Sequence, residues 1–270
     1  MNTRRPTLGA FNQGIMPTIA CFIDKTTTTP LGVDIDQLVT AMQAYVDQHV
    51  APVWGTPAKL TKTTGFLKDS WAVVFLDDAD QPGALAYHDL TPDGLPLSKV
   101  FVRTTIQAGD LVSVSASHEL VEMLVDPAIN IMTTGPDPKT MYAYESADPV
   151  EALSFDVNGI AMSDFVYPSF FEVFRKANSV PFDHLQKVTK PFEVLSGGYQ
   201  IIFKNGKWSQ VFGTASKEKA FAKEDRRGHR SETRKRTGPN KLIKTSVTEI
   251  AKKQKAAQAM MVKRAAASMR

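Results

Sequence analysis

Short apolar runs separated by turn-forming residues dominate the first hundred positions of the chain, and they predict a set of β-strands. Runs of this length bounded by Pro, Gly, Asp and Thr are typical of strands buried in a sheet. The expected strands are residues 18–24, 59–64, 71–76, 84–88 and 98–104.

Two other stretches place their apolar residues at helical spacing. Beginning with Leu38, such residues predict a helix over residues 34–49, whose first turn Asp34 or Asp36 can cap. A second helix is expected over residues 110–125, where it ends just before an Asp-Pro pair.

The second half of the chain is richer in turns and aromatic residues. Asn-Gly pairs at 158–159 and 205–206 lie between strand-like runs and predict two β-hairpins with two-residue turns. An aromatic block at residues 163–171 is expected to pack beside the helix over 110–125. The order strand, helix, several strands, helix and hairpins predicts an α+β fold.

Composition divides the chain into three parts. Residues 1–17 are expected to form an irregular arm, and residues 18–213 hold all the expected elements in one domain. Residues 214–270 are rich in Lys, Arg and Ala and contain few large apolar side chains. Such a tail cannot bury a core of its own, so it is expected to be either disordered or helical against a partner.

Charge is distributed unevenly between these parts. Residues 215–270 contain 17 Lys and Arg against 5 Asp and Glu, whereas the rest of the chain contains 15 against 23. An acidic body favours a cation as ligand, and a basic tail favours an anionic partner. Residues 216–270 are therefore expected to contact nucleic acid or an acidic protein surface.

The segment Ser117–Pro127 carries the clearest candidate chemistry. On a helix, His118 and Glu122 lie four positions apart on one face and can bind one ion together. Glu119 lies about 100° further around, within reach of a water on that ion. The spacing is that of the His-Glu-x-x-His helix of zinc peptidases, with Glu in place of the second His.

A catalytic zinc ion usually has three protein ligands, so a third is needed from outside this helix. The acidic cluster of Glu145, Asp148 and Glu151 is the expected source. A set of one His and two carboxylates also suits manganese, iron or calcium. His88 and His184 have no partner at ligand spacing and are not counted among the ligands.

The same residues have a simpler interpretation. Glu119 and Glu122 also fit the solvated face of an ordinary amphipathic helix. Glu145 and Asp148 also fit a solvated turn, because Asp-Pro and Glu are common there.

The location of the protein is suggested by what the sequence lacks. Cys21 is the single cysteine, so no intramolecular disulfide can form. The chain has neither an apolar leader after Met1 nor a run of apolar residues long enough to span a bilayer. A soluble cytoplasmic protein with no membrane partner is expected.

Four segments together resemble a family of uncharacterised bacterial and phage proteins with a zincin-like signature. They are Ser117–Pro127, Tyr144–Glu151, Met162–Phe171 and Gly197–Trp208, and the resemblance extends over about residues 18–213. It implies a zincin-like domain, in which a mixed sheet packs on the motif helix and an edge strand binds substrate by strand addition.

The resemblance also implies roles for individual residues. His118 and Glu122 would be metal ligands, Glu119 the general base, and Glu145 or Asp148 would complete the ligand set. The edge strand is expected near residues 100–104.

Two functional hypotheses of different class follow from these observations. The first is a metal-dependent hydrolase, a zinc peptidase that cuts protein or peptide substrates. The second is a non-enzymatic phage or virion protein that keeps a zincin-like scaffold and works through its basic tail.

Overall fold

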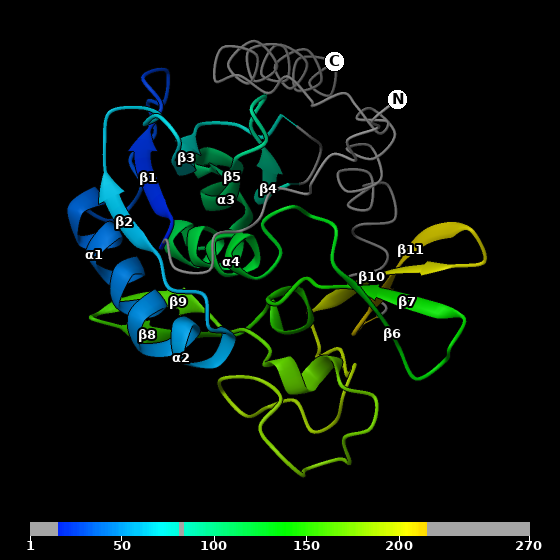
Figure 1. The fold of residues 1–270 in the computed structure, drawn as a ribbon. Helices are drawn as coiled ribbons and strands as arrows, with labels where there is room; N and C mark the ends of the chain where they lie inside the picture. The colour runs from blue at the N-terminus through cyan, green and yellow to red at the C-terminus, as the bar shows by residue number, and fades with distance from the viewer. Residues whose placement is uncertain (1–15, 81–83, 215–270) are drawn as a thin grey trace, which may run out of the picture.

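A five-stranded mixed sheet lies at the centre of the structure (Figure 1). The computed structural model describes residues 16–80 and 84–214. The predictions for the N-terminal arm, apart from its last two residues, and for the basic tail beyond residue 214 lie outside these ranges. Within them, the expected combination of helices and strands is confirmed as a mixed α/β arrangement with additional antiparallel hairpins.

The sheet has the strand order β2-β1-β3-β5-β4, and only β4 runs antiparallel to its neighbour. Its strands are β1 (Thr18–Ile23), β2 (Lys59–Lys62), β3 (Trp71–Leu76), β4 (Ala86–Leu90) and β5 (Pro96–Phe101). The sequence prediction of an edge strand near residues 100–104 is wrong, because β5 is paired on both sides and β4 forms the edge on that side of the sheet.

The two faces of the sheet bury different apolar side chains, because successive residues of a strand point in opposite directions. On β1, Ile19 and Cys21 join a large core with the helices α1 (Ile35–Tyr45) and α4 (Val112–Val125). Ala20 and Phe22 join a smaller cluster on the opposite face. Both long helices therefore pack on the same face of the sheet.

Helix α1 begins where the sequence predicts. Asp34 is its N-cap, and the carboxylate accepts the backbone N–H groups of Asp36 and Gln37. The helical path continues through a π-helical turn, η1 (Val46–Val50), into α2 (Ala51–Trp54). Pro52 does not stop it and lies in the first turn of α2, directly after the π-helical turn.

The segment after β5 differs from its prediction. Strand geometry ends at Phe101, and α3 (Val102–Ala108) follows directly, so the expected strand over 98–104 ends three residues too late. Gly109 ends α3 in the left-handed conformation, with φ of 85°, which glycine adopts without steric cost.

Helix α4 is buried on two sides, by strands of the sheet and by the hairpin of β8 (Ser154–Val157) and β9 (Ile160–Ser163). Every residue of α4 except Val114 is buried. The Ser98 hydroxyl on β5 donates to the Glu119 carbonyl (3.2 Å), and the Ser163 N–H on β9 donates to the Ser117 hydroxyl (2.8 Å). The interpretation of this helix as solvated is therefore wrong.

A second sheet follows α4 and has the order β11-β10-β7-β6. It consists of β6 (Met132–Thr134), β7 (Thr140–Ala143), β10 (Tyr199–Lys204) and β11 (Lys207–Phe212), with the 3-10 turns η2 (Asp148–Val150) and η3 (Pro168–Phe171) between β7 and β10. Both Asn-Gly hairpins are confirmed. Asn158 and Asn205 have positive φ, as a type I′ turn requires.

The aromatic block packs beside α2 and the segment after β7. The rings of Phe171 and Tyr144 stack with centroids 3.9 Å apart, and Trp54 contacts both. Phe165 is fully buried in the core that also contains α4. The block therefore packs against the segment that leads from β7 into η2.

A buried carboxyl pair lies just beyond β9, where Asp164 contacts Asp183. Asp164 Oδ1 accepts the backbone N–H groups of Phe165 (2.8 Å) and Leu185 (3.2 Å). Burial and the neighbouring Asp183 raise the pKa of Asp164 to about 8. The folded chain thus keeps a proton up to about pH 8 that the unfolded chain releases near pH 4.

This shared proton makes stability depend on pH. Because folding raises the pKa of Asp164, this residue stabilises the folded state fully below about pH 4. That stabilisation is lost as pH rises toward 8. We expect the free energy of unfolding to fall between about pH 4 and 8, and Asp164→Asn to reduce that fall by at least about 1–2 kcal/mol. Urea unfolding over this pH range measures it, with Asp156→Asn at an exposed position as control. The same pH profile in wild type and Asp164→Asn would contradict the shared proton.

Helices that could span a bilayer are absent from residues 16–80 and 84–214, since none there is both long and apolar enough.

Candidate metal centre

Helix α4 carries three functional candidates into the interior. The spacing predicted for His118 and Glu122 is confirmed, with His118 Nε2 3.5 Å from Glu122 Oε1. Glu119 follows His118 and is also buried. These polar side chains are held inside the protein because both faces of α4 are covered.

The segment after β7 brings two further carboxylates against the helix. Asp148 Oδ1 lies 3.2 Å from His118 Nε2. The backbone N–H groups of Ala147 (3.0 Å) and Asp148 (3.2 Å) donate to Glu122 Oε1. Glu145 precedes Asp148 in the same segment and is also buried. The acidic cluster is thus folded against α4, and its interpretation as a solvated turn is wrong for Glu145 and Asp148.

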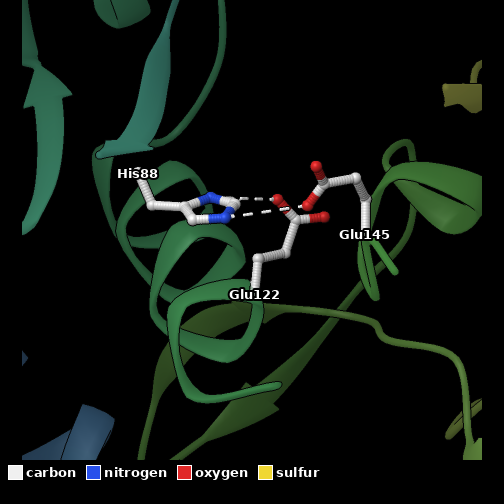
Figure 2. A group of neighbouring side chains, drawn as sticks. All are labelled: His88, Glu122 and Glu145. Carbon is white, nitrogen blue, oxygen red and sulfur yellow. Dashed lines mark ion pairs between the residues drawn. The ribbon is translucent and has the colours of Figure 1, made fainter. Parts of the chain in front are cut away.

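His88 on β4 is the residue that the sequence interpretation missed. Its Nδ1 lies 3.2 Å from Glu119 Oε2 and 3.7 Å from Glu122 Oε2, and its Nε2 lies 3.7 Å from Glu145 Oε2. Figure 2 shows the imidazole directed between the carboxylates of Glu122 and Glu145. Leaving His88 out of the candidate ligands is therefore corrected.

The pairing of β4 with β5 explains how His88 reaches the helix. His88 pairs with Ser98, whose hydroxyl donates to the Glu119 carbonyl on α4. Ala86, two residues earlier on β4, packs against the core that contains α4. A histidine at an inward-facing strand position is the one sequence signal that pointed to His88.

Two sets of three side chains can each hold a cation within this cluster. One is His88, Glu122 and Glu145, and the other is His118, Glu122 and Asp148. In each set, one ligand atom per residue lies within 4.8 Å of the others, and every residue is buried. Glu122 belongs to both sets.

The other sequence candidates lie outside these two sets. Glu119 contacts His88 Nδ1 and is positioned to orient that ring. Glu151 is in neither set. Nε2 of His184 lies 3.1 Å from His49 Nδ1, and Nδ1 of His184 lies 3.1 Å from the Tyr167 hydroxyl.

Distances within the cluster fit ligands of a shared ion. Ligands about 2.0–2.1 Å from a tetrahedral ion are separated by about 3.4 Å. Within the two sets, the histidine-to-carboxylate distances run from 3.2 to 3.7 Å, and those of His88 join Nδ1 to Glu122 and Nε2 to Glu145. The shortest of them, between His118 Nε2 and Asp148 Oδ1, is also a hydrogen bond. In each set the three ligand atoms lie within 4.8 Å of one another, which is close enough to share one divalent ion.

The nitrogen atom His88 Nε2 supports the same fit. It is buried, and it makes no hydrogen bond within the part of the chain that the structure describes. Buried polar atoms without hydrogen bonds are rare and need an explanation such as a bound ion. A cation between His88 Nε2 and Glu145 Oε2 would satisfy this atom.

Protonation in the cluster reflects burial and charge together. Burial lowers the pKa of His118, but the Glu122 charge and the contact with Asp148 raise it well above its usual value. Burial also opposes protonation of His88, yet the hydrogen bond to Glu119 and the nearby carboxylates raise its pKa to about 9. Burial raises the pKa values of Glu122 and Asp148. A bound cation would take the place of these protons.

Comparison of the chain with protein-family models, with curated proteins and with solved structures found no match. No family match therefore supports the resemblance to zincin-like proteins. The finding that stands is a buried cluster of His and acidic side chains that can hold a metal ion.

Proposed function

We propose that the protein is a divalent-metal-dependent hydrolase that cleaves peptide bonds. The observation that carries this proposal is the convergence of two histidines and three carboxylates from β4, α4 and the segment after β7, with Glu122 at the centre. Side chains that lie far apart in the sequence and gather in the interior with ligand-like distances are typical of a functional metal site.

A bound divalent ion would supply a Lewis acid that polarises a scissile carbonyl and lowers the pKa of a water molecule. Zinc is the proposed ion, with manganese, iron and calcium as alternatives for a site rich in carboxylates. Glu119 lies beside both ligand sets without belonging to either. We assign it the role of general base, which accepts a proton from water and passes it to the leaving amine.

The arrangement of the sheet supports a peptide substrate. Strand β4 is an edge strand, antiparallel to β5, and it carries His88. A substrate segment added along the outer edge of β4 would form main-chain hydrogen bonds and run past the cluster. A mixed sheet packed on α4 is also what the zincin-like resemblance implies, with the edge role moved from residues 100–104 to β4.

A second candidate function is favoured by the burial of the cluster. Each of its residues is at most 9% exposed, and structural metal sites are closed in this way, whereas catalytic sites keep an open position. In that case the ion stabilises a non-enzymatic protein, such as a virion component. Its basic residues 216–270 would bind nucleic acid or an acidic protein through salt-sensitive contacts.

Hydrolysis of a mixture of unstructured peptides tests the first proposal. We expect cleavage to require zinc or manganese, to stop with a chelator, and to fall about 10²–10⁴-fold in Glu119→Gln. Glutamine keeps an oxygen that accepts the N–H of His88 Nδ1 but cannot take up a proton, so bound metal should be retained.

The control for this experiment is Glu172→Gln, a partly exposed carboxylate that pairs with Arg175. Full activity in Glu119→Gln would refute the assigned base. Stoichiometric metal without cleavage of any peptide would favour the structural alternative. Deleting residues 216–270 would then abolish partner binding, whereas under the first proposal it spares hydrolysis.

A further inference from the structure

The two carboxylate oxygens of Glu122 face two different histidines. Oε1 lies 3.5 Å from His118 Nε2, and Oε2 lies 3.7 Å from His88 Nδ1. The histidines come from separate elements, α4 and β4, so they approach Glu122 independently. A carboxylate placed in this way presents one oxygen to each of two positions, as a bridging ligand does.

Each position has its own additional carboxylate. Glu145 Oε2 lies 3.7 Å from Nε2, the other nitrogen of the His88 ring, and one ligand atom each of His88, Glu122 and Glu145 lies within 4.8 Å of the others. Asp148 Oδ1 lies 3.2 Å from His118 Nε2. Both three-residue sets are buried. The cluster therefore consists of two separate pairs, each of one histidine and one carboxylate, which share Glu122.

Charge balance distinguishes one ion from two. Glu119, Glu122, Glu145 and Asp148 with two neutral imidazoles carry a formal charge of −4 in a buried volume. One divalent cation would leave two negative charges, which two retained protons would have to compensate, because buried charges without compensation are strongly unfavourable. Two divalent cations would make the cluster formally neutral.

We propose that the cluster is a dinuclear centre, in which Glu122 bridges one cation held with His88 and Glu145 and a second held with His118 and Asp148. This inference rests on the proposed metal-binding function and specifies its cofactor. Ions in two-metal hydrolytic sites are about 3.5–4 Å apart, a separation that a single bridging carboxylate spans. The mixture of nitrogen and oxygen donors suits zinc, manganese or iron(II).

The two positions should differ in affinity. Glu122 Oε1 already accepts the backbone N–H groups of Ala147 and Asp148, which compete with a cation for its lone pairs. Oε2 instead faces the His88 ring, 3.7 Å from Nδ1. His88 Nε2 also lacks a hydrogen bond within the described ranges. We therefore expect the position at His88 to fill first.

Titration of the metal-free, full-length protein with Mn²⁺ tests the dinuclear centre. We expect about two bound equivalents by calorimetry and elemental analysis, and an electron paramagnetic resonance spectrum of a magnetically coupled manganese pair. His88→Ala and His118→Ala should each bind about one equivalent and show uncoupled Mn²⁺. His184→Ala, outside the cluster, should keep the wild-type stoichiometry and coupling.

The outcomes separate this proposal from the hydrolase proposal. One equivalent with an uncoupled spectrum in the wild type would overturn the dinuclear centre, whether or not peptides are cleaved. Two coupled equivalents without peptide cleavage would support it and overturn only the hydrolase. Failure to bind Mn²⁺, Zn²⁺ or Fe²⁺ would overturn both. The wild-type measurement decides the question even if a histidine variant does not fold.

Discussion

Replacement of Glu122 by Ala is expected to abolish metal binding and to destabilise the metal-free protein by about 3–5 kcal/mol. Glu122 is 3% exposed and belongs to both ligand sets, so neither set keeps three ligands without it. Its loss also leaves the buried N–H groups of Ala147 and Asp148 without their acceptor and removes one of the two carboxylate partners of His118. Urea unfolding in the presence of a chelator measures the destabilisation, and elemental analysis measures the metal.

Glu122→Gln separates the two parts of this effect. Glutamine keeps an oxygen that can accept the N–H groups of Ala147 and Asp148 but loses the charge that a cation needs. We expect it to destabilise the metal-free protein less than Glu122→Ala does while binding equally little metal. Glu172→Ala serves as a control, because a partly exposed ion pair contributes about 0–1 kcal/mol. Wild-type stability and metal content in Glu122→Ala would contradict the central position given to this residue.

Removal of the metal from the wild-type protein is the second large effect. A ligand that binds only the folded state at about 1,000 times its Kd stabilises that state by about 4 kcal/mol. For domains of about 150–250 residues, each kcal/mol shifts the Tm by about 2–4 °C. We therefore expect a chelator to lower the Tm by about 8–16 °C, and added zinc or manganese to restore it.

The physical cause is the repulsion among buried carboxylates, which the cation relieves. Differential scanning calorimetry of metal-loaded and chelated protein measures the shift. Glu122→Ala is the control, and its Tm should be the same with metal and with chelator. The His184→Ala variant should respond like the wild type, because His184 is outside both ligand sets. Equal Tm values for loaded and chelated wild type would show that no cation is coupled to folding.

Local geometry explains which parts of the site could be predicted from the sequence. The pairing of His118 with Glu122 follows from helix spacing alone, because residues i and i+4 are neighbours wherever the helix lies. The Asp34 cap and the Asn-Gly turns are local in the same sense. The downstream carboxylates Glu145 and Asp148 were also singled out, although their division between two histidines was not.

Non-local contacts explain the predictions that were wrong. His88 joins the cluster because strand pairing places it beside Ser98, which touches α4. No spacing within the sequence encodes that contact. The expected edge strand near residues 100–104 failed for the same reason, since the order of strands in a sheet depends on which partners pair across the fold.

The sequence by itself thus determined the local elements, the acidic character of the body and the two metal-ligand candidates on α4. The tertiary structure alone decided that α4 is enclosed on two sides, that β4 is an edge strand, and that His88 completes a second set of candidate ligands around Glu122. The physical reason is the range of the interactions. Helix spacing and turn chemistry act over a few residues, whereas burial and strand pairing bring together side chains that no local pattern connects.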